Sequence, residues 1–365
     1  MELLSGWRRA RSGRAGRSAA NRPRRRQPTT DLRLEVLEGR AVLAVMVPMF
    51  SHPHPGSGAM TPAATSGPTG FMAAAMRTAY GMDAVTFGTV TGDGSGQTIA
   101  IVDAYDWPTM TTDMNTFNTK MGLPSCTLIK VNQTGQTTGL PAADAKGGWG
   151  VETAMDCEWA HAMAPKATIL LVEANSANDA DLYTAVDTAR NWPGVTAVSM
   201  SWGGDETSTD SANDYHFTSP AGHPGVTFFA SSGDNGKYAS AGTTTVIGSY
   251  PAISPNVVAV GGTNLKTGTN NVWSSETGWG NGTSSMSSGG SGGATSKYAV
   301  QPSYQKGMVP TSMSGATSPK RTIPDIAADA DPNTGASICS SYDYSASAPW
   351  DVSGARASRR RCGPE

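Results

Sequence analysis

Two acidic residues four positions apart form the pair in this chain that is best suited to proton transfer. Glu152 and Asp156 fall in a segment with helical spacing, residues 150–163, so both side chains project from one face of a helix. The neighbouring Trp149 and Trp159 favour a buried helix, where two carboxyl groups titrate as a unit and one proton is held more tightly. The pair therefore predicts a general base that operates in acid. A solvated helix face, on which the two charges repel each other, is the alternative.

A third carboxyl group follows a predicted strand. Asp234 lies in the turn Ser231-Ser-Gly-Asp-Asn-Gly236, directly after the apolar run 226–230. Because ligands bind beyond the carboxyl ends of parallel strands, this position predicts a carboxyl group at the ligand-facing edge of a sheet. Ser201 and Trp202 follow the apolar run 195–200 and are expected at the same edge. An ordinary Asp-Asn-Gly turn would explain Asp234 equally well.

No histidine stands in a motif that marks a catalytic base or a zinc ligand. The chain has no His-Glu-x-x-His pattern, and we expect His161, on the predicted helix, to be structural. A hydrolase built from this sequence would rely on carboxylates instead. The cysteines form neither a Cys-x-x-Cys pair nor a zinc-like spacing, which argues against a structural metal held by cysteine. One disulfide, with no pairing defined by the sequence, remains open among Cys126, Cys157, Cys339 and Cys362.

Alternating strands and helices must position these groups. Apolar runs predict buried strands at residues 97–102, 167–172, 195–200, 226–230 and 257–260. Amphipathic or helix-spaced segments predict helices at residues 111–122, 150–163 and 179–191. This order predicts an α/β domain whose parallel sheet is covered on both faces. Residues 262–320, rich in Gly, Ser and Thr, predict long surface connections.

The net charge of −2 conceals a segregation of charge along the chain. Residues 1–40 carry 11 Arg against 4 acidic residues, and the last ten residues carry 4 Arg against one Glu. The remainder has a net charge of −12, so nucleic acid and anionic membranes are not expected partners. Stable membrane insertion is not expected either, since no apolar run reaches the roughly 18 residues that a spanning helix needs.

The basic N-terminal region predicts export to the cell surface or the medium. Residues 1–50 combine an Arg-rich stretch, expected to be disordered, with a short apolar run. They also contain a Leu-Glu-x-Leu-Glu-x-Arg sequence, residues 34–40, similar to an element of some exported bacterial proteins. A nucleic-acid-binding tail is the alternative. Residues 51–70, rich in Pro, Gly and Ser, predict a linker.

Several motifs together resemble the sedolisins, serine-carboxyl peptidases that have a subtilisin-like fold but use Glu in place of His. Residues 148–165 are similar to the family's Glu-x-x-x-Asp helix, and residues 199–203 resemble the strand that pairs with the substrate backbone. The turn around Asp234 resembles the oxyanion-aspartate turn, and residues 324–332 resemble the segment that leads to the nucleophile. The resemblance implies a peptidase domain over residues 71–354, with a three-layer, subtilisin-like α/β fold and a mainly parallel sheet that is incomplete at the C-terminus.

The resemblance also implies a role for each site residue. Glu152 would take the proton of a serine hydroxyl, and Asp156 would hold and tune Glu152, as Asp orients His in a conventional triad. A neutral Asp234 would donate a hydrogen bond to the tetrahedral oxyanion. An ordinary Asp pKa of about 3.9 allows this only in acid, where a His base with a pKa of about 6.5 would be charged. The residues implied to bind the substrate backbone are Ser201, Trp202 and Gly203.

The serine that the family requires is missing from its expected place. The family motif Gly-Thr-Ser-x-x-x-Pro follows the Asp-Pro segment, but after Gly354 this chain continues as a basic tail, residues 355–365. Ser345-Ala-Ser-Ala-Pro349 imitates part of the motif without the Gly-Gly-Thr before it. A one-base deletion near Gly354 would explain the tail, since suitable third bases in the shifted frame restore Gly-Thr-Ser-x-Ser-Ala-Pro. An unrelated basic tail is the alternative.

These features predict a serine-type endopeptidase that acts as a monomer and cleaves proteins or peptides at acidic pH. The nucleophilic serine of such an enzyme is missing from this sequence. The alternative is an exported, non-catalytic protein that keeps a peptide-binding cleft. A subtilisin-type enzyme is more distant, because its His motif is absent. The family binds calcium through residues beyond position 354, so no cofactor and no metal ligand is assigned.

Overall fold

The computed structural model describes residues 65–353 apart from residues 146–147, 224, 237–245 and 281–288. The predicted export region, most of the linker, Cys362 and the basic tail lie outside the described residues.

The helices are α1 Ala73–Ala79, α2 Met110–Met121, α3 Trp149–Met163, α4 Asp179–Asn191 and α5 Thr311–Ser314, with 3-10 helices η1 Met82–Ala84, η2 Asp210–Phe217, η3 Thr269–Asn271 and η4 Ser303–Gln305. The strands are β1 Thr86–Phe87, β2 Val90–Thr91, β3 Thr98–Ala104, β4 Thr127–Asn132, β5 Thr168–Ala174, β6 Val195–Met200, β7 Gly204–Asp205, β8 Thr227–Ser231, β9 Ser249–Tyr250, β10 Val258–Thr267, β11 Trp273–Gly278, β12 Ala294–Val300, β13 Lys320–Ile323, β14 Ile326–Asp329, β15 Ala336–Cys339 and β16 Trp350–Ser353.

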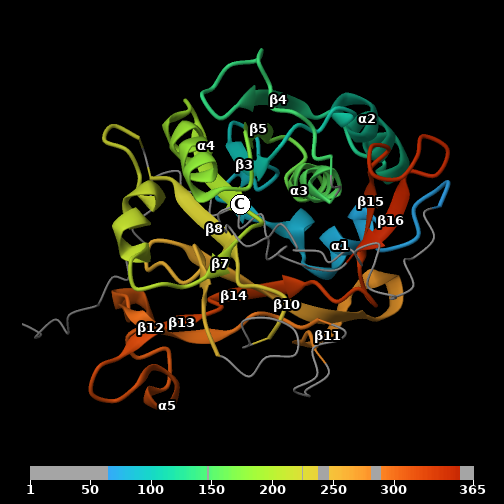
Figure 1. Ribbon diagram of the computed structural model, residues 1–365. Helices are drawn as coiled ribbons and strands as arrows, with labels where there is room; N and C mark the ends of the chain where they lie inside the picture. The colour runs from blue at the N-terminus through green and yellow to red at the C-terminus, as the bar shows by residue number, and fades with distance from the viewer. Residues whose placement is uncertain (1–64, 146–147, 224, 237–245, 281–288, 354–365) are drawn as a thin grey trace, which may run out of the picture. The chain divides into compact units, whose positions relative to one another are not determined.

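An eight-stranded sheet lies at the centre of the described domain. Its strands follow the order β11-β10-β8-β6-β3-β5-β4, and β14 pairs with β10. Every pairing is parallel except that of β10 with β11. Alternate residues of β3 face opposite sides, so that Ile99 and Ile101 pack with α2 and α3 while Ala100 and Val102 pack with α4. The helices therefore cover both faces of the sheet, which confirms the predicted three-layer α/β architecture (Figure 1).

Each predicted strand starts within two residues of the corresponding strand in the structure. The helix predicted at 179–191 and the strand predicted at 195–200 agree with α4 and β6 at both ends. The sequence analysis missed β4, which lies at one edge of the sheet and in which four of the six residues are only half-buried.

The prediction of surface connections over residues 262–320 is wrong in part. This region contains the second half of β10, all of β11 and all of β12, because β-strands of mixed polarity pair there along the edge of the domain. Its glycine-rich part, residues 289–293, forms backbone hydrogen bonds to the turn that follows β8. Small residues at these positions allow two backbones to approach closely, which composition alone does not distinguish from a flexible loop.

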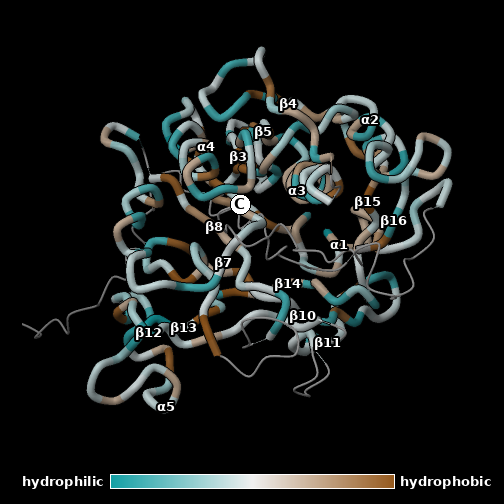
Figure 2. Tube along the Cα trace, viewed as in Figure 1, coloured by the Kyte–Doolittle hydropathy of each residue, from teal (hydrophilic) through white to brown (hydrophobic). Residues whose placement is uncertain are grey.

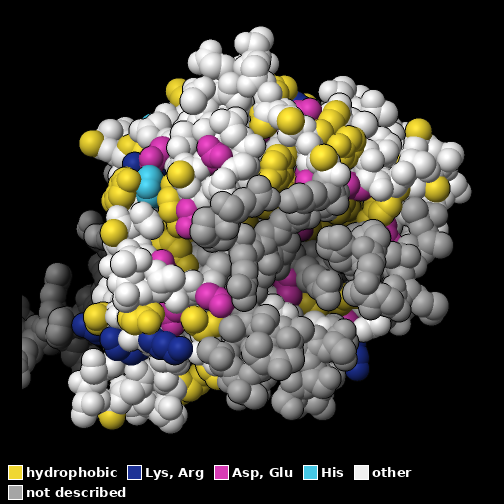
Figure 3. Space-filling view, viewed as in Figure 1, with side chains coloured by type: hydrophobic (Ala, Val, Ile, Leu, Met, Phe, Trp, Pro, Cys, Tyr) yellow, Lys and Arg dark blue, Asp and Glu magenta, His cyan; other side chains and the backbone are white. Residues whose placement is uncertain are grey.

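Charge and hydropathy are distributed as expected of an acidic domain with a buried sheet. Hydrophobic stretches lie mainly on the central strands and on the helix sides that face them (Figure 2). Acidic side chains are spread over one face, whereas Lys and Arg gather at one side beside β12 and β13 (Figure 3). Of the helices in the described ranges, none has the length and apolarity needed to cross a bilayer. The three described cysteines, Cys126, Cys157 and Cys339, are free thiols.

Candidate active site

Two of the candidate residues, Ser201 and Asp234, lie along one edge of the sheet because they follow neighbouring parallel strands. The strands β3, β6 and β8 are adjacent, and their carboxyl ends lead to Ala104, Ser201 and Ser232. Asp234 comes two residues after Ser232, in a turn whose Gly233 has a φ of 106°, a value that favours glycine. The sequence-based expectation that Ser201 and Asp234 share one edge is therefore consistent with the sheet order.

Helix α3 brings the carboxylate pair to the same edge. The chain leaves α3 at Met163 and enters β5 at Thr168, at the amino ends of the strands, so the first turn of α3 lies at their carboxyl ends. All 15 residues of α3 are buried, between the sheet on one side and α1, α2 and β15 on the other. Glu152 stands in the first turn of α3 and Asp156 one turn further along the helix. Both side chains are buried. The alternative of a solvated helix face is excluded.

Burial governs the protonation of this pair. The pKa of Glu152 lies well above its ordinary value, first because the group is buried and then because Asp156, Asp103 and Asp234 repel its charge. A position in the first turn of a helix favours a carboxylate by only about 0.3–1 kcal/mol, which does not offset the loss of hydration. Burial also raises the pKa of Asp156 to about 7, and the nearby Ser201 side chain opposes the rise. The pair thus holds at least one proton up to about neutral pH and releases its protons in coupled steps.

Asp103 is a site residue that the sequence analysis did not single out. It lies at the end of β3, is completely buried, and has a pKa raised by burial and by Asp156, while the Thr153 hydroxyl lowers it. Its register partner on β5 is Glu173, whose Oε1 accepts a hydrogen bond from the Trp107 backbone N–H at 2.9 Å. Buried carboxyl groups therefore continue from α3 across two strands. An acidic residue that ends an apolar run was the available signal.

Residues 199–203 divide into two functionally different parts. Ser199 pairs with Ile101 of β3 on one side and with Phe229 of β8 on the other, so its backbone has no edge left for a substrate. Only the residues after β6 can offer their backbone to a peptide. This narrows the expected substrate-binding strand to Ser201, Trp202 and Gly203.

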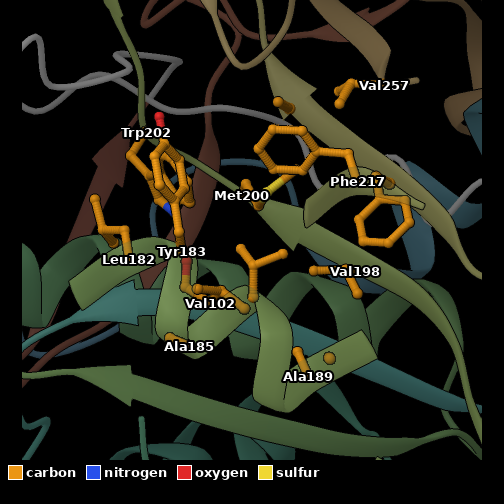
Figure 4. Packing of buried hydrophobic residues seen from close by; sticks show 14 of the residues in the cluster. Val102, Leu182, Tyr183, Ala185, Ala189, Val198, Met200, Trp202, Phe217 and Val257 are labelled. Atoms are coloured by element: carbon orange, nitrogen blue, oxygen red, sulfur yellow. The ribbon is translucent and has the colours of Figure 1, made fainter. Parts of the chain in front are cut away.

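The side chain of Trp202 belongs to the core. Its indole N–H donates to the Val102 carbonyl at 2.8 Å, and its ring lies 6.2 Å from that of Tyr183. Figure 4 shows Trp202 beside Leu182, Tyr183 and Val102, on the side of the sheet covered by α4. Trp202 is 4% exposed, so a contribution to substrate binding falls to its backbone.

The motif-like segment Ser345-Ala-Ser-Ala-Pro349 lies in a loop. Ser345 and Ser347 are exposed in the connection between β15 and β16, and their hydroxyl oxygens lie 3.3 Å apart. The chain's single Gly-Thr-Ser tripeptide, residues 282–284, precedes the Asp-Pro segment, lacks the following Pro, and lies outside the described residues. The position after Gly354, where the family motif is expected, also lies outside them.

Comparisons with known proteins agree with this geometry. The model of the subtilase family matches residues 137–358. Kumamolisin from Bacillus sp. (strain MN-32) is 34% identical over 67% of this chain and 44% of its own length, and sedolisin from Pseudomonas sp. (strain 101) is 32% identical over 64% and 40%. The chain thus spans less than half the length of these curated relatives.

A solved structure extends the similarity to three dimensions. Pseudomonas sedolisin, a serine-carboxyl proteinase complexed with two molecules of pseudo-iodotyrostatin, superposes with a TM-score of 0.63 and 26% identity. The match covers 80% of this chain and 77% of that one. With the subtilase model matching more than half of its residues, the chain belongs to the subtilase family and, within it, to the sedolisins.

Proposed function

We propose that this site is the base and oxyanion half of an endopeptidase that cleaves proteins or peptides in acid. Glu152 is the general base, Asp156 tunes it, and Asp234 in its neutral form stabilises the oxyanion. The observation that carries the proposal is that Glu152 Oε1 is buried and has no hydrogen-bond partner among the described residues. A serine hydroxyl at this oxygen would supply the missing partner and, by donating to the carboxylate, would lower the pKa of Glu152.

The reaction follows from these roles. Glu152 takes the serine proton while the serine oxygen bonds to the carbonyl carbon, and the carbonyl oxygen becomes an oxyanion that accepts a hydrogen bond from Asp234. Collapse breaks the C–N bond as Glu152 returns its proton to the leaving amine. Water then repeats both steps on the acyl-enzyme and releases the acid. Activity falls at low pH when the Glu152–Asp156 pair is fully protonated, and at high pH when Asp234 ionises.

We further propose that the nucleophile belongs directly after Gly354 and that residues 355–365 are translated out of frame. Sequencing the gene past residue 365 tests this, because the shifted frame must continue as open coding sequence. Restoring that frame gives a protein, here called the restored chain, that can be assayed on denatured protein substrates from pH 3 to 7. We expect cleavage by the restored chain, and a loss of at least about 1,000-fold in kcat on Glu152→Gln.

A non-catalytic, exported peptide-binding protein is the second candidate. It is favoured by the absence of Gly-Thr-Ser-x-x-x-Pro after the Asp-Pro segment. This candidate predicts that the restored chain is inert although it binds peptides, which fluorescence anisotropy with a labelled peptide would detect. Cleavage that disappears in Glu152→Gln excludes it. Export itself is tested by fusing residues 1–70 to a reporter protein and measuring the reporter outside the cell.

A further inference from the structure

The turn that carries Asp234 is held by a second segment far away in the sequence. Residues 231–236 form the oxyanion turn, and residues 289–293 lie against it as a backbone strip, here called the glycine clamp. The Gly290 N–H donates to the Asp234 carbonyl at 2.8 Å, and the Gly290 carbonyl accepts from the Gly236 N–H at 3.0 Å. The Gly292 N–H donates to the Gly233 carbonyl, so successive residues of the turn are fixed from one side.

The clamp is itself anchored to Gly262, in the middle of β10. Ser291 donates its N–H to the Trp279 carbonyl at 3.0 Å, and its hydroxyl oxygen accepts from the Gly262 N–H at 2.9 Å. Trp279 in turn donates its N–H to the Gly262 carbonyl at 3.0 Å. Because β10 pairs directly with β8, which leads into the turn, the clamp and the turn share one rigid support.

The clamp requires glycine at position 292 because no space is left there for a side chain. A Cβ at Gly292 would lie well inside 3.0 Å of the Ser232 carbonyl oxygen and the Gly233 nitrogen, distances that real Cβ atoms do not show. Both of these neighbours are backbone atoms, which cannot rotate away. The Ser232 hydroxyl adds a bond from the turn side, donating to the Gly292 carbonyl at 2.9 Å. At Gly293, by contrast, an added Cβ would meet nothing closer than 3.6 Å.

We infer that the glycine clamp is a positioning element for Asp234, and that Gly292 is its least replaceable residue. An oxyanion donor acts only when it is held where charge develops, and a displacement of about 1 Å is enough to cost about 100-fold in rate. Asp234 has no rigid strand or helix of its own, since it stands in a turn beyond β8. The clamp supplies the missing rigidity through backbone hydrogen bonds to the residues on both sides of it. This inference rests on the proposed role of Asp234.

The first test uses the chain as given and does not require activity. Aspartate labelled with ¹³C at the carboxyl carbon is incorporated, and the Asp234 resonance is assigned from its loss in Asp234→Asn. We expect Gly292→Ala to move the Asp234 resonance and its titration midpoint by about half a pH unit or more, while the Asp329 resonance stays in place. Gly293→Ala is the matched control and should titrate like the parent. A parent-like Asp234 signal in Gly292→Ala overturns the inference.

The second test separates the clamp from the proposed function. In the restored chain we expect Gly292→Ala to lower kcat by about 10- to 100-fold with KM within twofold, and Gly293→Ala to behave as the parent. An inert restored parent contradicts the proposed function, and the titration then decides the clamp alone. If Gly292→Ala does not fold, Ser232→Ala, which deletes one hydrogen bond, should produce a smaller shift of the same Asp234 signal. No shift in Ser232→Ala would then refute the inference.

Discussion

A buried carboxyl group outside the candidate active site gives a sharp prediction about stability and pH. Asp329, at the end of β14, is fully buried, and burial raises its pKa from 3.8 to about 7. Its Oδ1 accepts hydrogen bonds from the Leu265 N–H at 3.1 Å and the Thr334 hydroxyl at 2.6 Å, whereas Oδ2 has no partner among the described residues. The neutral acid therefore suits this position and the carboxylate does not.

The sign and size of the effect follow from linkage. Between pH 3.8 and about 7 the folded chain binds more protons at Asp329 than the unfolded chain does, so the contribution of Asp329 to stability is full below this window and is lost as pH rises through it. Three pH units at 1.36 kcal/mol per unit give about 4 kcal/mol as an upper value. Because the carboxylate gains some hydration by local relaxation, we expect about 2–4 kcal/mol.

The substitution Asp329→Asn isolates this contribution. Asn keeps an oxygen acceptor for Leu265 and Thr334 and resembles the neutral acid in shape, but it cannot ionise. In urea unfolding from pH 4 to 8, the free energies of unfolding of the variant and the parent should be similar at pH 4, and the variant should be more stable at pH 8 by about 2–4 kcal/mol. Asp83→Asn, at a carboxyl group that is 67% exposed, is the control and should follow the parent. Parallel pH profiles for Asp329→Asn and the parent would refute the reasoning.

Two further predictions concern the site and the core. In the restored chain, Ser201→Ala removes a hydroxyl group that lowers the pKa of Asp156, so the acidic limb of the kcat/KM profile should move to higher pH. Arg321 is fully buried and forms a bidentate ion pair with Asp325. Arg321→Met should therefore reduce the free energy of unfolding by about 3–5 kcal/mol in urea titrations, and adding Asp325→Asn should recover part of the loss because the partly buried Asp325 charge is then no longer left unpaired.

The strand and helix pattern was predictable because burial on both faces leaves a strong trace in sequence. Apolar runs in the sequence predict β3, β5, β6 and β8, and an amphipathic segment predicts α4. Strand β4 was not predicted because it is an edge strand with half-buried positions, and such positions tolerate Thr, Lys and Asn. The same limit applies to β11, five of whose six residues are exposed.

The candidate site was predictable where one local motif contains it and unpredictable where several segments meet. Glu152, Asp156 and Asp234 stand in short motifs with recognisable spacing. Asp103 stands in no such motif, because its partner Asp156 is 53 residues away and only the packing of α3 on β3 brings the two charges together. The buried side chain of Trp202 was likewise hidden, since a Trp after a strand is compatible with either a cleft or a core.

The sequence by itself determined the class of chemistry, because residue type and local spacing fix which groups can exchange protons and which strand each one follows. It also determined the α/β order and the charge of each region. Only the tertiary structure decided how these groups behave. Burial of every residue of α3 raises the pKa of its carboxyl pair, and a glycine segment that begins 53 residues after the oxyanion turn holds Asp234 in place. Desolvation and close backbone approach arise from contacts between distant segments, so no local pattern records them.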